Sequence, residues 1–431
     1  MNNPEKQKET PMARVMALRN FRLLFIGSTT SLLGDQFTLI ATPWLVLQLT
    51  GDPLALGIVL ALEGIPRAIF MLLGGAITDR ISQRTVMLVA DCIRFILTAL
   101  MAGLVFSGMI QMWMLYSFGL CFGLVAGFAI PAQNSIVPML VDEQDLEAGN
   151  SIMMGITQLV GFLGPTIAGV LIGKFSDSLV GIGLAFSVDA FTFAISAGAL
   201  WFMQFKTAMK QALNAEEGEN VWQSIGNGLR YLWNDKVLRL MFLVLTAINF
   251  LLMGPLMVGI PVLADQRLPE GAIAYGILMS AFAGGNLLGY LMAGSLPHPN
   301  PNGMKAILLI LTASFGLVIA ALGFIPYTWL DFGLLFLLGL GNGYIAIILF
   351  TWMQKRSPKD MLGRMMSLIM LSNTGLTPLS QAIAGVVSKV DLTLLFISAG
   401  LLVLLVTLVA AFQPELNTFA EGVVATQSAA D

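Results

Sequence analysis

Long apolar stretches follow one another along this chain, with only short polar joints between them. A helix that crosses a bilayer needs roughly 20 mostly apolar residues. Only 11% of the residues are charged, well below the share of about 25% that is typical of soluble domains. The sequence therefore predicts an all-α integral membrane protein with twelve transmembrane helices, at 21–48, 54–79, 85–107, 111–140, 150–173, 180–204, 237–264, 272–296, 304–326, 329–352, 362–388 and 392–412.

The longest polar joint, 206–235, separates two sets of six predicted spans. Its second part, 221–233, places apolar residues at helical spacing beside Arg230 and Lys236, which is typical of an amphipathic helix at a membrane surface. We therefore expect five parts along the chain: a cytoplasmic N-terminal segment at 1–20, an N-terminal six-helix bundle at 21–205, a cytoplasmic linker at 206–235, a C-terminal six-helix bundle at 236–413 and a disordered cytoplasmic tail at 414–431.

The two sets of spans resemble each other at a constant offset. Phe118-Gly119-Leu120 recurs as Phe332-Gly333-Leu334, 214 residues later, and Pro165 has its counterpart Pro378 within one residue of that offset. Two six-span repeats with a site between them are typical of membrane transporters. The sequence therefore predicts two pseudo-symmetric six-helix bundles.

Positive charges are distributed unevenly over the predicted joints. Lys and Arg concentrate in alternate joints and at the N-terminus, whereas the other joints hold only Lys174, Arg267 and Lys389. Because the positively charged loops of a membrane protein stay in the cytoplasm, we expect both termini there. The predicted location is the plasma (inner) membrane, crossed many times.

Six ionisable side chains lie well inside predicted spans, where a charge costs at least about 2.5–3.5 kcal/mol. At a rise of about 1.5 Å per residue, three of the six fall near one level, roughly 20 Å from the cytoplasmic ends of their spans. All six belong to the first half: Asp35, Glu63, Arg67, Asp91, Arg94 and Asp189.

The three residues at that level are Asp35, Glu63 and Arg67, and we interpret them as a proton-coupling site in a substrate cavity. Burial disfavours a carboxylate, whereas a neighbouring arginine favours it, and this competition suits a group that exchanges protons. The spacing leaves one alternative open for Glu63 and Arg67. They form an i,i+4 pair with the acid first, which is a favourable order for a permanent ion pair.

The other three deep charges are expected to have structural roles. Asp91 and Arg94 are one turn apart in the third span, nearer the cytoplasm, and they are predicted to form a charge pair. Asp189 in the sixth span is predicted to make an interhelical hydrogen bond or ion pair.

A short charged joint links the second and third predicted spans. Its pattern, Gly75-x-x-x-Asp79-Arg80-x-x-x-Arg84, resembles the loop signature of the major facilitator superfamily, with Ser82 where a second glycine is usual. Three further stretches are similar to the drug-efflux branch of that superfamily, which includes macrolide and enterobactin exporters: Leu33-Gly34-Asp35, Pro131-Ala132-Gln133-Asn134-Ser135-Ile136-Val137-Pro138 and Asp145-Leu146-Glu147-Ala148-Gly149-Asn150-Ser151.

The resemblance implies a cytoplasmic gate formed by Gly75, Asp79, Arg80 and Arg84. Asp79 would face the N-terminal end of the eleventh span, where the helix dipole favours an anion. Arg80 and Arg84 would help to hold the cytoplasmic side closed.

The fifth span contains Gly161-x-x-Gly164-Pro165-x-x-x-Gly169, which partly resembles the antiporter signature of the same superfamily. The implied role is antiporter-like helix packing. Small residues at such spacing also simply let helices approach closely, so the packing alternative stays open.

These features predict a secondary active transporter that exports a hydrophobic or amphipathic small molecule by alternating access, as a proton antiporter. The alternatives are a lysophospholipid or siderophore transporter and a transport-inactive receptor or scaffold. The expected partners are a small-molecule substrate, protons and the lipid bilayer, with no nucleic acid, and the chain is expected to be a monomer. We expect no enzymatic activity, cofactor or metal, since the chain has a single histidine, His298, and no phosphate-binding Gly-x-x-x-x-Gly-Lys loop.

Overall fold

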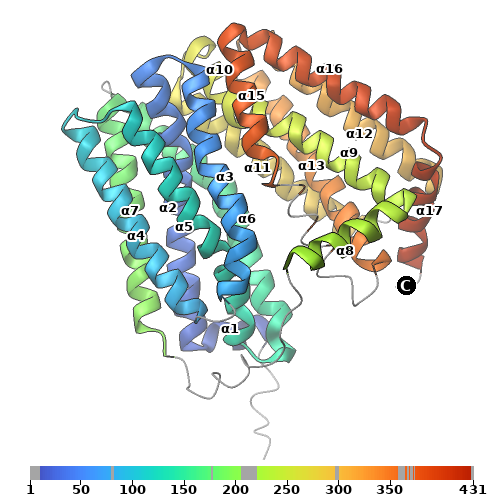
Figure 1. Cartoon of the computed structure of the whole chain (residues 1–431), viewed down its shortest axis with the longest axis horizontal. Helices are drawn as coiled ribbons and strands as arrows, with labels where there is room; N and C mark the ends of the chain where they lie inside the picture. The colour runs from blue at the N-terminus through green and yellow to red at the C-terminus, as the bar shows by residue number, and fades with distance from the viewer. Residues whose placement is uncertain are drawn as a thin grey trace, which may run out of the picture. The chain divides into compact units, whose positions relative to one another are not determined.

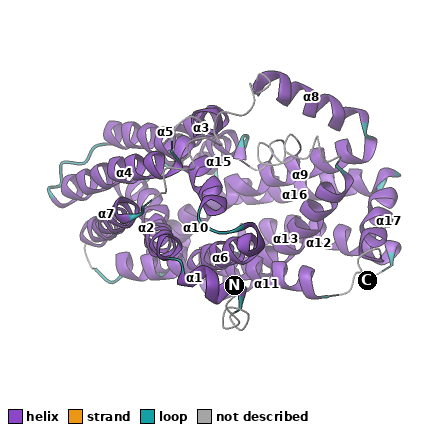
Figure 2. Cartoon of the chain, turned by 90° about the horizontal axis from the view of Figure 1, so that it is seen from below, coloured by secondary structure: helices purple, strands orange, loops and turns teal. Residues whose placement is uncertain are grey.

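The fold is helical throughout the part of the chain that the structure describes (Figures 1 and 2). This computed structural model describes residues 10–78, 82–175, 178–204, 221–296, 300–357, 365, 368, 372 and 374–428. The first half contains α1 (Pro11–Ala17), α2 (Arg19–Thr50), α3 (Pro53–Thr78), α4 (Gln83–Phe106), α5 (Met112–Ile136), α6 (Leu146–Gly173) and α7 (Ser178–Phe202). The second contains α8 (Val221–Asn234), α9 (Lys236–Gly254), α10 (Ile260–Arg267), α11 (Ala272–Ser295), α12 (Pro301–Leu322), α13 (Thr328–Arg356), α15 (Thr377–Val390), α16 (Leu392–Ala411) and α17 (Glu415–Ser428).

Eleven helical segments among the described residues are long and apolar enough to cross a membrane. They coincide with eleven of the twelve predicted spans, and α9 and α10 form one of them through a π-helical turn at Pro255–Gly259. The remaining predicted span, 362–388, begins outside the described residues and continues as α15. The predicted all-helical membrane fold is therefore confirmed.

The chain divides into two compact units. The first comprises Met1–Leu45 and Ile65–Glu216, and the second comprises Val46–Gly64 and Glu217–Asp431. The end of the α2–α3 hairpin, 46–64, thus belongs to the second unit, although the predicted N-terminal bundle at 21–205 includes it. Its contacts with α15 explain this assignment, because an added Cβ on Gly57 would lie 2.7 Å from the carbonyl oxygen of Gln381.

The helices pack in corresponding ways in the two halves. The third span packs extensively on the sixth, as α4 on α7 and as α12 on α16, and the members of each pair lie side by side in Figure 1. The fifth and sixth spans also meet in both halves, as α6 with α7 and as α15 with α16. Two similar six-helix bundles account for these matching contacts.

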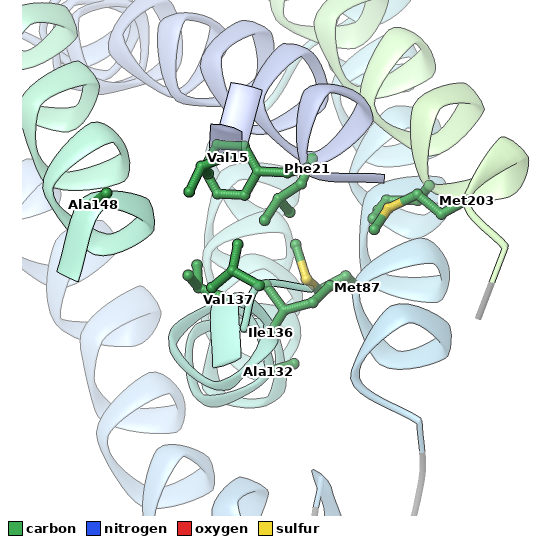
Figure 3. Close-up of a cluster of buried hydrophobic side chains, with 11 residues drawn as sticks. Val15, Phe21, Met87, Ala132, Ile136, Val137, Ala148 and Met203 are labelled. Atoms are coloured by element: carbon green, nitrogen blue, oxygen red, sulfur yellow. The ribbon is translucent and has the colours of Figure 1, made fainter. Parts of the chain in front are cut away.

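A cluster of buried apolar side chains joins the ends of six helices in the first unit (Figure 3). Phe21 and Val15 are fully buried in it, and an ion pair of 2.5 Å between Arg14 and Asp145 lies at its edge. The cluster fixes α1 against the bundle, since α1 is too short to be stable alone. Its members are Val15, Phe21, Leu24, Met87, Ala132, Ile136, Val137, Val141, Ala148, Leu200 and Met203.

The C-terminal tail differs from the expectation. The segment 414–431 was expected to be disordered, but residues Glu415–Ser428 form α17. Leu416, Phe419, Ala420 and Val423 recur at helical spacing and are all buried. Their burial against α9, α12 and α13 stabilises a helix that its polar composition disfavours.

Asp235, which directly follows α8, makes two kinds of contact within the second unit. Its Oδ1 accepts hydrogen bonds from the backbone N–H groups of Val237 (2.9 Å) and Leu238 (3.1 Å), which caps α9. Its Oδ2 forms an ion pair of 2.8 Å with Arg356 at the end of α13. Burial acts to raise the pKa of Asp235, but the hydrogen bonds from Leu238 and Arg356 outweigh it and hold the pKa below its usual value.

We predict that Asp235→Ala lowers the free energy of unfolding by about 1–2 kcal/mol, mainly through loss of the helix cap. Asp235→Asn keeps a cap acceptor and loses only the ion pair, so its effect should be at most about 1 kcal/mol. Because the folded pKa is lowered, the ionised carboxylate stabilises fully above the unfolded pKa of about 3.8 and loses this effect as the pH falls through the folded pKa. Thermal unfolding of the purified variants from pH 3 to pH 7 measures both effects, and equal losses for the two variants would contradict the capping role.

Candidate functional site

Helices α2 and α7 approach each other closely in the first unit because glycines face the contact. A Cβ added to Gly34 would lie 1.9 Å from Thr192 Oγ1 and 2.3 Å from Asp189 Oδ1. One added to Gly27, two turns earlier, would lie 3.2 Å from the Cβ of Ala199. Glycine at position 34 therefore lets a polar part of α7 lie directly against the backbone of α2.

Asp189 lies at this contact and is only 1% exposed. It accepts a hydrogen bond of 2.5 Å from Thr38 Oγ1 on α2, and the Thr192 hydroxyl lies 3.4 Å from its other oxygen. This is the interhelical hydrogen bond that the sequence led us to expect. Asp189 also interacts electrostatically with Asp35 and Arg94, so α2, α4 and α7 all contribute to its environment.

Asp91 and Arg94 on α4 extend the same group of charges. Asp91 is buried and accepts a hydrogen bond of 2.6 Å from Ser196 Oγ on α7. Its carboxylate interacts electrostatically with Arg94 and with Asp35. The guanidinium carbon of Arg94 lies 5.5 Å from the ring centre of Phe193, a distance at which a cation is attracted to the ring.

We refer to Asp35, Asp91, Asp189 and Arg94 as the acidic cluster. Sequence reasoning identified all four residues but treated Asp91 with Arg94 as a separate pair nearer the cytoplasm. The structure instead brings three carboxyl groups and one guanidinium together on three helices. Asp35 is the half-buried acid of the three, whereas Asp91 and Asp189 are buried.

Three hydroxyl side chains lie against the carboxyl groups of the acidic cluster and were not identified from the sequence: Thr38, Thr192 and Ser196. Hydroxyl groups in apolar helices commonly bond to their own backbone, as Thr192 does to the Asp189 carbonyl at 2.7 Å. The one available signal was their helical spacing from the acids, with Thr38 three residues after Asp35 and Thr192 three residues after Asp189.

Glu63 and Arg67 lie one turn apart on α3, and both are half-buried. Between them, Gly64 lies close to α15, since an added Cβ would be 2.5 Å from Pro378 Cγ. Their predicted association with Asp35 in a proton-coupling site remains a prediction.

The charged joint after α3 is only partly described. Gly75 lies in the last turn of α3, whereas Asp79 and Arg80 fall outside the described residues. Arg84 donates from Nε to the carbonyl oxygen of Leu200 and from Nη2 to that of Trp201, both at 2.6 Å. Since the last carbonyl groups of a helix have no partner within it, Arg84 caps α7. The predicted gate remains a prediction.

One glycine of the fifth span, Gly164, faces the helix that carries Asp35. An added Cβ on Gly164 would lie 2.4 Å from Gln36 Cγ, so α6 approaches α2 directly beside Asp35. Pro165 and Gly169 are also buried, whereas a Cβ on Gly161 would meet nothing within 4 Å. The segment therefore serves close packing, and its antiporter role remains a prediction.

The end of the α2–α3 hairpin carries polar contacts that sequence reasoning missed. Lys389 on α15 forms an ion pair of 2.8 Å with Asp52, and Gln48 donates to Asp265 Oδ1 at 3.0 Å. The hydrogen bond from Lys389 lowers the pKa of Asp52 below its usual value. One indication was present in the sequence. Lys389 is one of only three positive charges in the joints that are predicted to lie outside the cytoplasm.

The described residues include no group of three or more His, Cys, Asp or Glu side chains arranged to hold a metal ion. The acidic cluster offers the chemistry of its carboxyl groups. Carboxyl groups can take up or release a proton, and they can attract a cationic group.

Proteins similar to this chain in sequence are membrane transporters. A family model described as transmembrane secretion effector matches residues 10–428. The multidrug efflux pump Tap of Mycolicibacterium fortuitum is 26% identical over 403 residues, which cover 92% of this chain and 96% of that protein. The enterobactin exporter EntS of Escherichia coli is 24% identical over 377 residues, which cover 85% of this chain and 84% of that protein.

Solved structures with the same fold are transporters as well. The nucleoside transporter NupG matches with a TM-score of 0.67 at 16% identity, over 91% of this chain and 97% of that one. A bacterial homologue of the iron transporter ferroportin matches with a TM-score of 0.65 at 17% identity, over 92% of this chain and 99% of that one. At such identities the likeness concerns the fold alone. Since the family model spans almost the whole chain, the protein belongs to the transmembrane secretion effector family of the major facilitator superfamily and is a multi-pass membrane transporter rather than an enzyme.

Proposed function

We propose that this transporter exports hydrophobic or amphipathic small molecules from the cell by alternating access, as a proton antiporter. The observation that carries the proposal is the acidic cluster, in which Asp35 and Arg94 each interact electrostatically with the two buried acids, Asp91 and Asp189. The similarity to a multidrug efflux pump and an enterobactin exporter supports the direction and the kind of substrate. The proposed location is the inner membrane, with both termini in the cytoplasm.

The charge balance of the cluster favours proton uptake. Asp35 lies close enough to Asp91 and Asp189 to interact electrostatically with both, so the ionised forms of these acids repel one another. Like charges in a weakly polar interior repel each other strongly, and uptake of a proton removes this cost. Asp35 is the half-buried member, so it is the group we assign to exchange protons with the substrate pathway. Glu63 and Arg67 are proposed to take part in the same coupling.

Alternating access needs two sets of contacts that form in turn. For the outer side we propose the contacts of the α2–α3 hairpin with α15, which include the Asp52–Lys389 ion pair. For the cytoplasmic side we propose the joint with Gly75, Asp79, Arg80 and Arg84. Exposed ion pairs contribute little stability each, about 0–1 kcal/mol, so such contacts can break and re-form during transport.

A siderophore exporter is the second candidate, and the similarity to the enterobactin exporter favours it. The two candidates share the same direction of transport and differ in the substrate. They are therefore distinguished by the compounds that the protein moves.

Everted membrane vesicles with the protein test the proposal directly. Respiration acidifies their interior, and we expect uptake of ethidium, erythromycin or enterobactin that a protonophore abolishes, together with proton release from the vesicles when the compound is added. Vesicles without the protein serve as the control. Uptake that resists the protonophore would contradict proton antiport, and absence of protein-dependent uptake for all three compounds would contradict export of these classes.

A further inference from the structure

The second unit contains a cavity of about 300 Å³ among α9, α12 and α13. Its lining residues recur at helical spacing, as Met241, Leu245 and Ile248 do on α9. Residues three and four apart share one face of a helix, so each of the three helices turns one face towards the same space. The volume lies at the lower end of the range of about 300–1,000 Å³ that is usual for small-molecule sites.

The walls of the cavity are apolar and uncharged. Met, Leu, Ile, Val, Phe and Ala side chains form most of the lining, and no Asp, Glu, Lys, Arg or His is among the lining residues that the structure describes. A charged ligand would lose its hydration here without an opposite charge in return, which is costly. The cavity therefore selects neutral molecules.

A few uncharged polar side chains interrupt the apolar lining. Asn249, Tyr290, Thr312 and Asn342 reach the cavity from four different helices. Three of them make hydrogen bonds. Asn342 Nδ2 donates to Asn286 Oδ1 at 2.9 Å, Thr312 Oγ1 donates to the Leu308 carbonyl at 2.8 Å, and Asn249 Nδ2 donates to the Leu245 carbonyl at 3.1 Å. An apolar site with a few fixed polar groups orients a ligand that carries a hydrogen-bonding group.

Helix α17 covers part of the cavity. Leu416 and Phe419 contribute to the lining, and the ring of Phe419 packs edge-on against Trp352 with centroids 4.7 Å apart. Lys305 Nζ donates to Asn417 Oδ1 at 2.7 Å, which ties the exposed side of α17 to α12. Side chains from both the bundle and the C-terminal helix therefore form the walls of the cavity.

We infer that this cavity is a binding site, within the second unit, for a neutral apolar molecule with one hydrogen-bonding group. Binding there needs neither the acidic cluster nor a proton gradient, so the inference goes beyond the proposed export activity. A free aromatic compound and the chain of a neutral lipid both fit this chemistry, and competition experiments separate the two sources.

The test uses the full chain in phosphatidylcholine nanodiscs and the neutral photoprobe 3-trifluoromethyl-3-phenyldiazirine. Mass spectrometry should locate the label on peptides that contain Met241 and Phe419. Competition with 1-naphthol, with lauroylglycerol and with cationic lauroylcholine then defines the ligand class. We expect at least one neutral competitor to reduce this labelling by about fivefold or more and the cationic one to leave it unchanged. The more effective neutral competitor identifies a ring compound or a lipid chain as the source.

Two variants fill the cavity from different helices, Ala346→Phe on α13 and Ala410→Phe on α16, since both alanines line it. Each should reduce the labelling about fivefold or more, and thermal unfolding of each verifies that the fold is kept. Ala306→Phe places the same side chain on an exposed position of α12 and should leave the labelling unchanged. Labelling that neither filling variant alters, or that all three competitors reduce equally, would overturn the inference, whatever the outcome of the transport assays.

Discussion

Replacing Asp35 by asparagine is expected to reduce proton-driven export by about tenfold or more. Asparagine has nearly the same shape as aspartate but cannot take up a proton, so the acidic cluster loses the half-buried group that we propose exchanges protons. A tenfold change in the export rate corresponds to only about 1.4 kcal/mol. This is less than the cost of one uncompensated charge deep in a membrane, so loss of one ionisable group is sufficient to produce it. The measurement is the initial rate of uptake into everted vesicles with and without an imposed pH gradient.

The matched controls separate coupling from folding. Asp142→Asn makes the same change at an exposed position in the joint before α6 and should leave the rate unchanged. Asp35→Asn should still bind substrate and exchange it down its own gradient. If this variant keeps full pH-gradient-driven uptake, Asp35 is not the coupling group, and loss of uptake in Glu63→Gln alone would move that role to α3.

Replacing Gly34 by alanine is expected to destabilise the first unit by about 1–3 kcal/mol, which is the usual cost of overpacking a well-packed interior. The added methyl group would lie 1.9 Å from Thr192 Oγ1 and 2.3 Å from Asp189 Oδ1, so α2 and α7 must separate or both side chains must move. Transport should fall together with stability, because the hydrogen bond between Thr38 and Asp189 spans the same contact. Thermal unfolding and vesicle uptake measure the two effects.

Gly198→Ala is the control for this substitution. Gly198 lies on α7, and an added Cβ there would meet nothing within 4 Å, so the change should stay within about 0.5 kcal/mol. Combining Gly34→Ala with Thr192→Ala removes the nearest clashing atom and should restore part of the loss, which a double-mutant cycle quantifies. Equal stability of Gly34→Ala and Gly198→Ala would show that α2 and α7 are not in such close contact.

The helices were predictable from the sequence because membrane-length apolar runs leave few alternatives for the backbone. The deep charges were identified for the same reason, since an ionisable residue stands out in an apolar run. The partners of those charges were not predictable. Depth along a helix follows from residue counting, but whether Asp91 turns towards Ser196 depends on how α4 rotates against α7.

The contacts at Asp52 and at α17 were missed for a different reason. Lys389 lies 337 residues from Asp52 in the chain, and no local pattern connects them. In the tail, polar residues such as Asn417 and Thr418 obscured the spacing of the apolar ones. That spacing, from Leu416 to Val423, was the available signal for α17.

Two prolines lie beside the points where the α2–α3 hairpin passes from one unit to the other. Pro43 on α2 lies just before the division at Leu45, and Pro66 on α3 lies just after the division at Gly64. A proline inside a helix removes one backbone hydrogen bond, and helices bend most readily there. The hairpin therefore has one position in each of its two helices at which it can bend. Bending at Pro43 and Pro66 would let the tip of the hairpin release and regain its contacts with α15 while both helices stay intact.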